Sequence, residues 1–343
     1  MSAAPRIVSL VGSPAIDGLV ARHFEPDRDY GGVAELLVAA NLNDGVDWLP
    51  TAEALRHDWS HASGLDISAD VLVAEAAGQA VGFAEHSWRI RGGKVFHHLA
   101  VVVRPDVRHR GLGRALLAWA EDRVRRSLDA GTAGRIDLPH TLAGWADLEI
   151  PEVAPFAAAA GYHVDGYGVM MTRSLVDPIA EVGLPQGLEI RPVRPEDHRQ
   201  IWDADTEAFQ DHRDPWVRTE SDFTRWFTQP DLNTSLWLVA WDGDQVAGSV
   251  MNFVFRDENE RLSVERGWLE HVSVRRAWRN RGLASALISR SMRILRDLAL
   301  DEVALGADAE NLSGAVRLYE SLGFRRVRTS AGYRKAIEVP EAR

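Results

Sequence analysis

A short basic turn at residues 279–284, with the sequence Arg-Asn-Arg-Gly-Leu-Ala, is the part of the chain best suited to binding an anion. The first N–H groups of a helix have no partner inside the helix, and the helix dipole is positive there, so a helix that starts at this turn attracts negative charge. Gly282 and Ala284 carry little or no side chain, so a phosphate can approach the backbone closely. Arg279 and Arg281 add positive charge around it. The turn therefore predicts a binding site for a phosphate group.

Two predicted elements position this turn. Residues 268–274 are rich in apolar and β-branched side chains, which is typical of a strand. After the turn, apolar side chains recur largely at helical spacing in an otherwise polar segment, which predicts a helix. These side chains are Leu283, Leu287, Ile294, Leu295 and Leu298. A second predicted strand follows at residues 302–308, and a second predicted helix lies within residues 311–324.

The order strand, R-x-x-G-x-A turn and helix resembles the acyl-CoA signature of the Gcn5-related N-acetyltransferases (GNAT), whose usual form is Q/R-x-x-G-x-G/A. The segment that follows also resembles that family. Asn311 is followed by Ala315 four residues later and by Tyr319 four residues after that, and a Gly-Phe pair ends the helix. The turn alone is a weak signal, but the turn and both of its flanks agree with the family pattern across residues 268–324.

The chain contains an internal repeat, which predicts two domains. The same turn pattern occurs at residues 108–113, and the strands before the two turns also correspond. The resemblance implies an α/β (α+β) fold of two tandem acyl-CoA N-acyltransferase (GNAT) domains, each a mixed, mostly antiparallel sheet flanked by helices. We expect an N-terminal extension at residues 1–17, an N-terminal domain at 18–175, a linker at 176–186 and a C-terminal domain at 187–343.

The resemblance implies acetyl-CoA as the cosubstrate, with its pyrophosphate on the turn and its pantetheine arm along the exposed backbone of the strand before the turn. Main-chain groups near Val272 and Val274 would bind this arm and polarise the thioester carbonyl, while their side chains pack in the core. Asn311 would bind near the cosubstrate, cap the helix, or do both. The residues expected to bind acetyl-CoA are Val272, Val274, Arg279, Asn280, Arg281, Gly282, Leu283, Ala284, Ser285 and Asn311.

Tyr319 and Glu270 are the candidate catalytic residues. By resemblance Tyr319 would be the general acid, because a phenol of pKa about 10 can protonate a thiolate of pKa about 8.5 and stays protonated at neutral pH. The alternative is an aromatic side chain that packs on a helix end. Glu270 could take the amine's proton directly or through water, or it could be an ordinary solvent-facing strand residue. His271 should point to the opposite face unless the strand bulges, and it becomes the better base if Glu270 faces away.

The first half departs from the family pattern at the positions that would carry proton transfer. Alignment of the halves puts Ala157 in the place of Tyr319 and Leu99 in the place of Glu270. We therefore expect a degenerate N-terminal domain and a catalytic C-terminal domain, and a purely structural first half stays open. If the first half does bind an acyl-CoA, the corresponding residues are Val101, Val103, Arg108, His109, Arg110, Gly111, Leu112, Gly113 and Arg114.

The composition excludes several classes of protein. The 343 residues suit two domains, and a net charge of −11 argues against general nucleic-acid binding. The chain has no cysteine, which rules out disulfides, thiol nucleophiles and Cys-ligated zinc, and we expect no metal site. No stretch approaches the roughly 20 apolar residues of a membrane span. We expect a cytoplasmic protein with neither a membrane nor a nucleic-acid partner.

The combined prediction is an N-acetyltransferase that acts on a primary amine of a small molecule. Direct attack in a ternary complex is expected because no cysteine can carry the acyl group. Residues 207–216 would select the amine, and their acidic side chains would suit a cationic one. The tandem layout also resembles the mycothiol synthases, which modify an amino-sugar thiol precursor, and an aminoglycoside-type antibiotic is equally compatible. A non-catalytic acyl-CoA-binding sensor or docking protein is the alternative class, and the protein could be a monomer or a homodimer.

Overall fold

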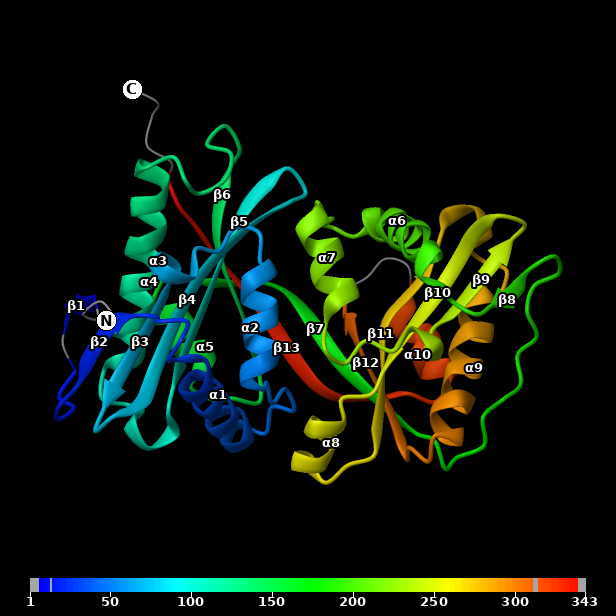
Figure 1. Ribbon diagram of the computed structural model, residues 1–343, viewed down its shortest axis with the longest axis horizontal. Coiled ribbons are helices and arrows are strands. Elements are labelled where there is room, and N and C mark those ends of the chain that lie inside the picture. The colour runs from blue at the N-terminus through cyan, green and yellow to red at the C-terminus, as the bar shows by residue number, and fades with distance from the viewer. Residues whose placement is uncertain (1–5, 13, 311–313, 339–343) are drawn as a thin grey trace. The chain divides into compact units, whose positions relative to one another are not determined.

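The computed structural model describes residues 6–12, 14–310 and 314–338. The chain divides into two compact units (Figure 1). Unit 1 contains the chain up to Asp165, the segment Thr219–Pro230 and the chain from Gly332 onward. Unit 2 contains Gly166–Arg218 and Asp231–Ala331. Each unit combines a sheet with helices, as the sequence predicts for each half.

Unit 1 contains a sheet whose strands β1 to β6 follow their chain order. Neighbours run antiparallel up to β5, whereas β5 and β6 run parallel. The strands are β1 (Ile7–Val8), β2 (Val20–His23), β3 (Val71–Ala76), β4 (Gln79–Arg91), β5 (Lys94–Val103) and β6 (His140–Asp147). The helices are α1 (Tyr30–Asp44), α2 (Ala52–His61), α3 (Ile67–Asp70), α4 (Leu112–Asp129), α5 (Val153–Ala159) and α7 (Glu220–Thr228), with a 3₁₀ turn at η1 (Pro105–Val107).

Alternation along β3 separates two hydrophobic cores in unit 1, because successive side chains of a strand point to opposite faces of the sheet. Val71 and Val73 pack with Tyr30 of α1 and Trp59 of α2. Leu72, on the other face, packs with the buried side of α4. The sheet of unit 1 is therefore covered by α1 and α2 on one face and by α4 on the other.

Unit 2 repeats this plan with the strand order β7, β12, β11, β10, β9, β8. Only β11 and β12 run parallel among these paired strands of the described chain. The strands are β7 (His163–Ser174), β8 (Glu189–Arg191), β9 (Leu238–Asp242), β10 (Gln245–Phe253), β11 (Arg266–Val274) and β12 (Glu302–Asp308). The helices are α6 (His198–Ala208), α8 (Arg256–Leu262), α9 (Leu283–Asp297) and α10 (Ala315–Ser321), with 3₁₀ turns at η2 (Pro195–Asp197), η3 (Phe209–Asp211), η4 (Thr234–Leu236) and η5 (Arg276–Trp278).

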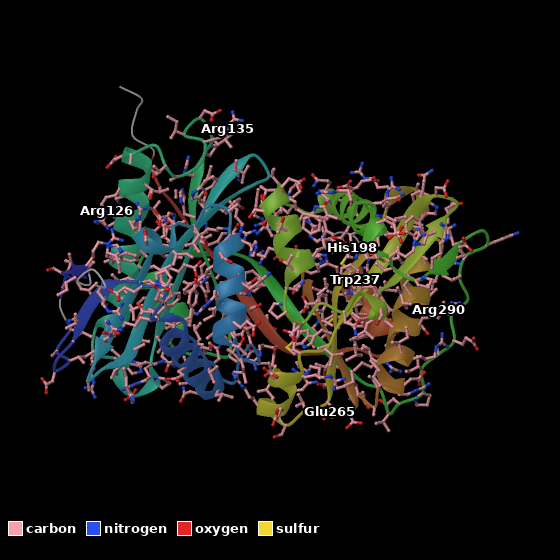
Figure 2. The ribbon with its side chains drawn as sticks, in the orientation of Figure 1. Arg126, Arg135, His198, Trp237, Glu265 and Arg290 are labelled. Carbon is pink, nitrogen blue, oxygen red and sulfur yellow. The ribbon has the colours of Figure 1, made fainter. Side chains whose placement is uncertain are left out.

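The helix predicted after the basic turn is α9, and it begins within the turn, at Leu283. Leu283, Leu287 and Leu295 are fully buried in the core of unit 2, whereas Leu298 is exposed. Trp237, which lies just before β9 (Figure 2), is also buried. Its ring centre lies 6.1 Å from that of Phe253. The apolar stripe of α9 thus fixes the helix against the sheet, and with it the position of the turn at its start.

Three elements lie wholly or partly in a unit other than the one their sequence position suggests. Residues Gly168 to Ser174 of β7, from the first half of the sequence, pair with β12 in unit 2. Helix α7, from the second half, packs in unit 1, where Ser221 Oγ donates a hydrogen bond of 2.6 Å to the carbonyl of His61. The last strand, β13 (Arg325–Ala336), belongs to unit 2 up to Ala331 and to unit 1 beyond it. The compact units therefore divide the chain differently from the predicted domains 18–175 and 187–343. Those bounds describe the repeat in the sequence, and as domain bounds they stay a prediction.

The segment expected to be a linker, residues 176–186, is held on unit 2. Ile179 and Leu184 pack against the core of that unit. Arg173 donates a hydrogen bond of 2.7 Å to the carbonyl of Pro178. Ser289 of α9 also donates to the carbonyl of Ala180. These contacts give the segment a fixed course along unit 2.

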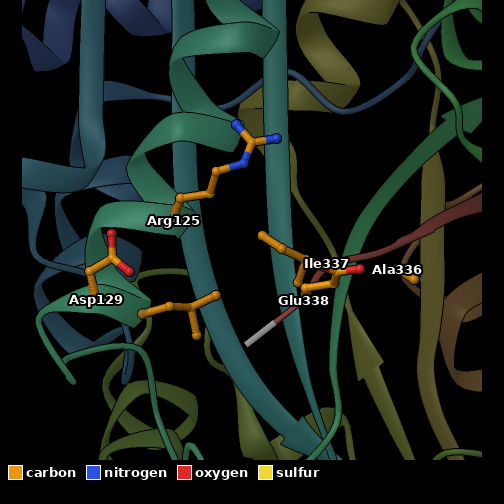
Figure 3. Close-up of a pocket in the computed structure, with 6 residues that line it drawn as sticks. Arg125, Asp129, Ala336, Ile337 and Glu338 are labelled. Carbon is orange, nitrogen blue, oxygen red and sulfur yellow. The ribbon is translucent and has the colours of Figure 1, made fainter. Parts of the chain in front are cut away.

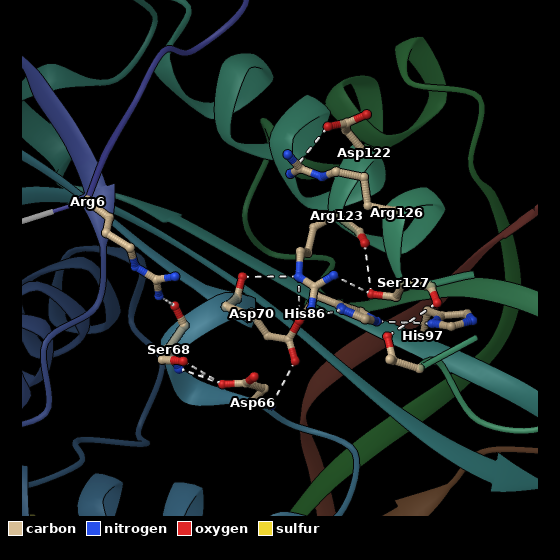
Figure 4. Close-up of polar contacts among 12 residues, drawn as sticks. Arg6, Asp66, Ser68, Asp70, His86, His97, Asp122, Arg123, Arg126 and Ser127 are labelled. Atoms are coloured by element: carbon tan, nitrogen blue, oxygen red, sulfur yellow. Dashed lines mark hydrogen bonds and ion pairs between the residues drawn. The ribbon is translucent and has the colours of Figure 1, made fainter. Parts of the chain in front are cut away.

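A chain of buried polar side chains crosses unit 1 (Figure 4). His86 Nδ1 lies 3.3 Å from Asp70 Oδ1, and His86 Nε2 lies 3.0 Å from His97 Nδ1. His97 Nε2 lies 2.8 Å from His140 Nδ1, and His140 Nε2 lies 3.0 Å from the carbonyl oxygen of Arg135. Burial lowers the pKa of His97 to about 3, with the two neighbouring histidines acting in the same direction, so this ring stays neutral.

Candidate active site

The basic turn at residues 279–284 has the backbone shape of an anion site. Asn280 and Gly282 both have positive φ, 59° and 82°, which is the left-handed backbone found in turns whose N–H groups bind anions. Gly282 is the N-cap of α9, and its position carries no capping side chain. A Cβ added to Gly282 would meet no atom of the described chain within 4 Å. The Cβ position of Gly282, at the start of α9, thus adjoins open space, which suits the close approach of a phosphate.

Arg279 fastens the turn to its surroundings. Its Nε donates to the carbonyl of Val274 at 2.9 Å, and a terminal nitrogen donates to the carbonyl of Ala208 at 3.0 Å. Its guanidinium also forms an ion pair with Asp211, which Arg276 shares. The structure therefore gives Arg279 an anchoring role at the end of β11, and the exposed arginine of the turn is Arg281.

The strand before the turn separates from its neighbour where a cofactor arm would have to lie. Parallel pairing of β11 with β12 covers Arg266 to Trp268 in the described chain. The remainder of β11, from Leu269 to Val274, continues without a partner in β12, while its other edge pairs with β10. The side chains of Val272 and Val274 are partly buried against the core, as expected. Backbone groups on the open edge can take up an extended ligand as an added strand.

A β-bulge in β11 falls at Glu270. Met251 of β10 pairs with His271, and the next residue, Asn252, pairs with Leu269, so Glu270 is the extra residue. Glu270 is exposed to solvent, yet burial among protein atoms raises the pKa of its carboxyl, and His271 acts in the opposite direction. A side chain that water reaches and protein surrounds on several sides has both properties. The bulge removes the strict alternation that would otherwise send Glu270 and His271 to opposite faces.

His271 is held by a buried carboxylate that sequence reasoning did not identify. His271 Nδ1 lies 2.9 Å from Oδ2 of Asp205, a residue of α6 whose side chain is fully buried. Arg218 donates to the same oxygen at 2.8 Å. Burial alone would raise the pKa of Asp205, but His271 and Arg218 outweigh it, and the pKa is lowered. Asp205 and His271 are far apart in the sequence, so no spacing pattern could signal their contact.

Tyr319 lies on α10 and is 7% exposed in the core of unit 2. Its ring meets that of Phe324 edge-on at 6.0 Å. Burial raises the pKa of Tyr319 to about 12, so the phenol stays protonated at neutral pH. Packing on the helix end and proton donation are compatible, because the first concerns the ring and the second the hydroxyl. Asn311, the other residue expected near the cosubstrate on this segment, lies outside the described residues.

Unit 1 has the turn but a different strand. Gly111 has φ 88° and precedes α4, and Arg108 donates to the carbonyl of Val103 at 3.1 Å and pairs with Asp44, as Arg279 does with its partners. The pairing of β4 with β5 continues without a register shift, so the described part of unit 1 has no bulge at the position that matches Glu270. Ala157, at the position of Tyr319, is buried. At the two positions compared, the first half therefore lacks the carboxyl and phenol groups that the second half carries.

The acidic segment expected to select the amine is largely neutralised. Asp211 pairs with Arg276 and Arg279, and Glu207 forms an ion pair of 2.7 Å with Arg275. These carboxylates therefore bind the segment after β11 and leave little net charge for a cationic substrate. The expectation of an acidic amine site at residues 207–216 receives no support from this geometry.

Other features lie away from this site. A pocket of about 390 Å³ in unit 1 is lined by the C-terminal end of α4, the end opposite to the Gly111 turn, together with residues 336–338 (Figure 3). In the described part of the chain, no group of three or more His, Asp or Glu side chains could hold a metal ion. Across residues 6–12, 14–310 and 314–338, we find no helix with the length and apolar character needed to cross a membrane.

Comparison with known proteins extends over both halves. The acetyltransferase (GNAT) family profile matches residues 197–324, and a GNAT domain profile matches residues 68–149. The mycothiol acetyltransferase of Geodermatophilus obscurus is 31% identical over 316 residues, which cover 90% of this chain and 96% of the relative. That of Salinispora arenicola is 30% identical, with 92% and 97% covered.

Two solved structures resemble the whole chain. A GCN5-related N-acetyltransferase from Sphaerobacter thermophilus has a TM-score of 0.69 at 27% identity, with 94% of this chain and 96% of that chain covered. A tandem GNAT protein from the clavulanic acid biosynthesis pathway has a TM-score of 0.67 at 17% identity, with 93% and 98% covered, and at that identity it shows the shared fold. The predicted tandem arrangement of this fold is confirmed.

Proposed function

Because this chain belongs to the Gcn5-related N-acetyltransferase family and is an acyltransferase, we propose that it transfers the acetyl group of acetyl-CoA to a primary amine of a small molecule. The second half carries the reaction. The observation that carries the proposal is that three features lie on or directly after one strand of unit 2, β11. They are an uncapped helix start behind a glycine turn, an open backbone edge, and a bulge with two proton acceptors.

Each feature has a role in the proposed reaction. The N–H groups at the start of α9, from Leu283 to Ser285, bind the pyrophosphate, with Arg281 near it. The open edge of β11 binds the pantetheine arm, and a backbone N–H near Val272 polarises the thioester carbonyl. This carbonyl carbon then accepts the amine directly, since the chain has no cysteine to carry the acyl group.

Proton transfer falls to Tyr319 and to the bulge. Tyr319 gives its proton to the departing sulfur as the C–S bond breaks, and its raised pKa keeps the phenol protonated until that moment. Glu270 takes a proton from the incoming ammonium. Its raised pKa makes it a stronger base than an ordinary carboxylate, and its exposure lets it pass the proton to water.

For the amine itself we propose the amino-sugar thiol precursor of mycothiol. The support is that relatives named mycothiol acetyltransferase align along nearly the whole length of this chain. An aminoglycoside-type amine is the alternative. The neutralised acidic segment around Asp211 disfavours a polycationic substrate, because its carboxylates are already paired with arginines.

The test is incubation of the purified protein with acetyl-CoA and a panel of amines that includes the mycothiol precursor and an aminoglycoside. Products are followed by mass spectrometry, because the precursor carries a thiol that would interfere with a thiol-release assay. We expect acetylation of the precursor amine. Binding of acetyl-CoA without transfer to any amine would favour a non-catalytic acyl-CoA sensor, and transfer to aminoglycosides alone would replace the substrate assignment.

A further inference from the structure

The contact between Asp205 and His271 has the geometry of a carboxylate that orients an imidazole. His271 lies beside the bulge, and its Nδ1 is 2.9 Å from Oδ2 of Asp205. The ring of His271 also packs against that of Phe209, with 5.3 Å between centroids. A side chain that is held through a ring nitrogen and packed against a second ring has little freedom to turn.

Asp205 is itself held in place. Arg218 donates to its Oδ2 at 2.8 Å, and the guanidinium of Arg218 lies 4.5 Å from the ring centre of Trp202. The side chains of Asp205 and Arg218 are almost completely buried, with exposed fractions of 0% and 7%. His271 remains 21% exposed. The carboxylate is thus a fixed interior acceptor, and the imidazole extends from it toward the surface at the bulge.

An ionised carboxylate accepts hydrogen bonds and cannot donate them, so the contact fixes the tautomer of His271. Nδ1 must carry the hydrogen, and the lone pair of the neutral ring is then on Nε2. The lowered pKa of Asp205 keeps the carboxylate ionised in the working range. The pair therefore presents a proton acceptor at a fixed position on β11.

The stoichiometry of the proposed reaction calls for two proton acceptors. An ammonium that becomes an amide N–H loses two protons: the first when it becomes a free amine, the second when the new C–N bond forms. One proton is balanced by the proton that Tyr319 gives to sulfur, and the other is released to water. The bulge offers two proton acceptors, Glu270 and His271. The first step takes a proton from a free ammonium, whereas the second takes it from a nitrogen that is bonding to carbon.

We propose that Asp205 is a positioning residue that holds His271 with its Nε2 toward the attacking nitrogen, so that His271 takes the second proton while Glu270 takes the first. The inference rests on the proposed acetyl transfer. As the nitrogen bonds to the carbonyl carbon, its N–H proton passes to Nε2, the C–S bond breaks, and the sulfur receives the proton of Tyr319. The proton on His271 then returns to the Tyr319 phenolate through water.

Several charged groups lie near His271 in the described part of the chain. On the same strand, Glu270 is adjacent. On the elements packed against it, Asp205 and Arg218 form the pair described above. Asp211 of η3 is engaged by two arginines. The pH experiment below therefore compares Glu270 with the Asp205–His271 pair.

The two steps respond differently to pH, which gives a discriminating experiment. At alkaline pH the amine arrives uncharged, so a Glu270→Gln enzyme should lose activity near neutrality and regain it as the pH rises. Asp205→Asn should lower kcat by about 10- to 100-fold at every pH, because the asparagine amide can donate to Nδ1 and thereby select the wrong tautomer. His271→Gln should match it, and the double variant should be no slower than either single variant.

Two further measurements separate positioning from a general loss of structure. The KM for acetyl-CoA should stay within about twofold in Asp205→Asn, since the helix start is untouched. Nitrogen-15 NMR of labelled histidine should show His271 with its hydrogen on Nδ1 in the wild type and on Nε2 in Asp205→Asn. Asp222→Asn is the matched control. It removes an equally buried aspartate that pairs with Arg89 in unit 1, and it should leave kcat unchanged.

The outcomes distinguish this inference from the function on which it rests. Absence of acetyl transfer by the wild type would overturn the proposed function, and the NMR experiment would still report the tautomer. An active wild type with an equally active Asp205→Asn would overturn the inference alone. Recovery of Asp205→Asn at alkaline pH would also overturn it, because the pair would then serve the first deprotonation.

Discussion

A glycine-to-alanine exchange at the two equivalent turns tests the phosphate site most directly. Gly282 and Gly111 have nearly the same left-handed backbone, with φ of 82° and 88°. A Cβ at Gly282 would meet nothing within 4 Å, and one at Gly111 would come within 3.9 Å of a single atom, on Pro14. Neither substitution creates a clash, so each should cost only the left-handed penalty of about 1–2 kcal/mol in folding stability.

The two variants should then differ in ligand binding. In Gly282→Ala the methyl group would occupy the space above the first N–H groups of α9. Loss of one charge-assisted hydrogen bond to phosphate costs about 1.5–3 kcal/mol, which raises the Kd for acetyl-CoA by roughly 10- to 100-fold. Gly282→Glu should abolish binding, because it also adds a negative charge. Gly111→Ala should leave kcat unchanged if the first half is not catalytic.

Calorimetric titration with acetyl-CoA and thermal unfolding of the same samples provide the assay. We expect Tm to fall by a similar amount in the two alanine variants. At the catalytic site, the Kd for acetyl-CoA should rise in Gly282→Ala and not in Gly111→Ala. Unchanged affinity of Gly282→Ala, with the expected fall in Tm, would refute the assignment of the turn as the phosphate site. A large loss of kcat in Gly111→Ala would refute the assignment of catalysis to the second half.

The remaining predictions concern the proposed general acid Tyr319, the half-buried Glu85 and the division of the chain. Tyr319→Phe should lower kcat by about 100-fold or more with acetyl-CoA affinity retained, as steady-state kinetics and titration would show; unchanged turnover would remove the proposed acid. Burial raises the pKa of Glu85 from 4.5 to about 7, so folding favours its protonated form, and stability should fall as pH rises through this window. Chemical unfolding of Glu85→Gln should lack that decline, and an identical pH dependence would contradict the reasoning. A fragment of residues 187–343 lacks β7, which pairs with β12, so it should elute as aggregate or show no cooperative melting; a soluble, cooperatively folded fragment would show that unit 2 does not need this strand.

The parts of the fold that depend on short-range patterns were predictable. The apolar stripe of α9 and the glycine turn before it lie within a few residues of each other, and the helix begins within the turn, at Leu283. The order of strands and helices in each half follows from the same kind of pattern, so the tandem acyltransferase fold could be predicted. The R-x-x-G-x-A turn is too short to identify a family by itself, but its agreement with the family pattern on both sides made it sufficient.

The parts that depend on distant contacts could not be predicted. The bulge at Glu270 is a mismatch between the pairing of β10 and β11, and a strand's own sequence does not report which residue its partner omits. Asp205 is an ordinary aspartate in a helix until the fold brings His271 to 2.9 Å from it. Arg279 was expected to add positive charge beside a phosphate, but in the structure it donates to the carbonyl of Val274. A guanidinium can donate to a carbonyl as well as to an anion, so the residue type alone does not say which partner it takes.

The line of histidines in unit 1 has a direction. A carbonyl oxygen can only accept, so His140 must hold a hydrogen on Nε2 toward Arg135, and His97 and His86 must then each donate through Nε2 to the next ring. At the other end of the row, His86 Nδ1 lies 3.3 Å from a carboxylate oxygen of Asp70, and Arg123 lies 2.8 Å from the same oxygen. The ring-to-ring donors therefore all point the same way, from His86 toward the carbonyl of Arg135.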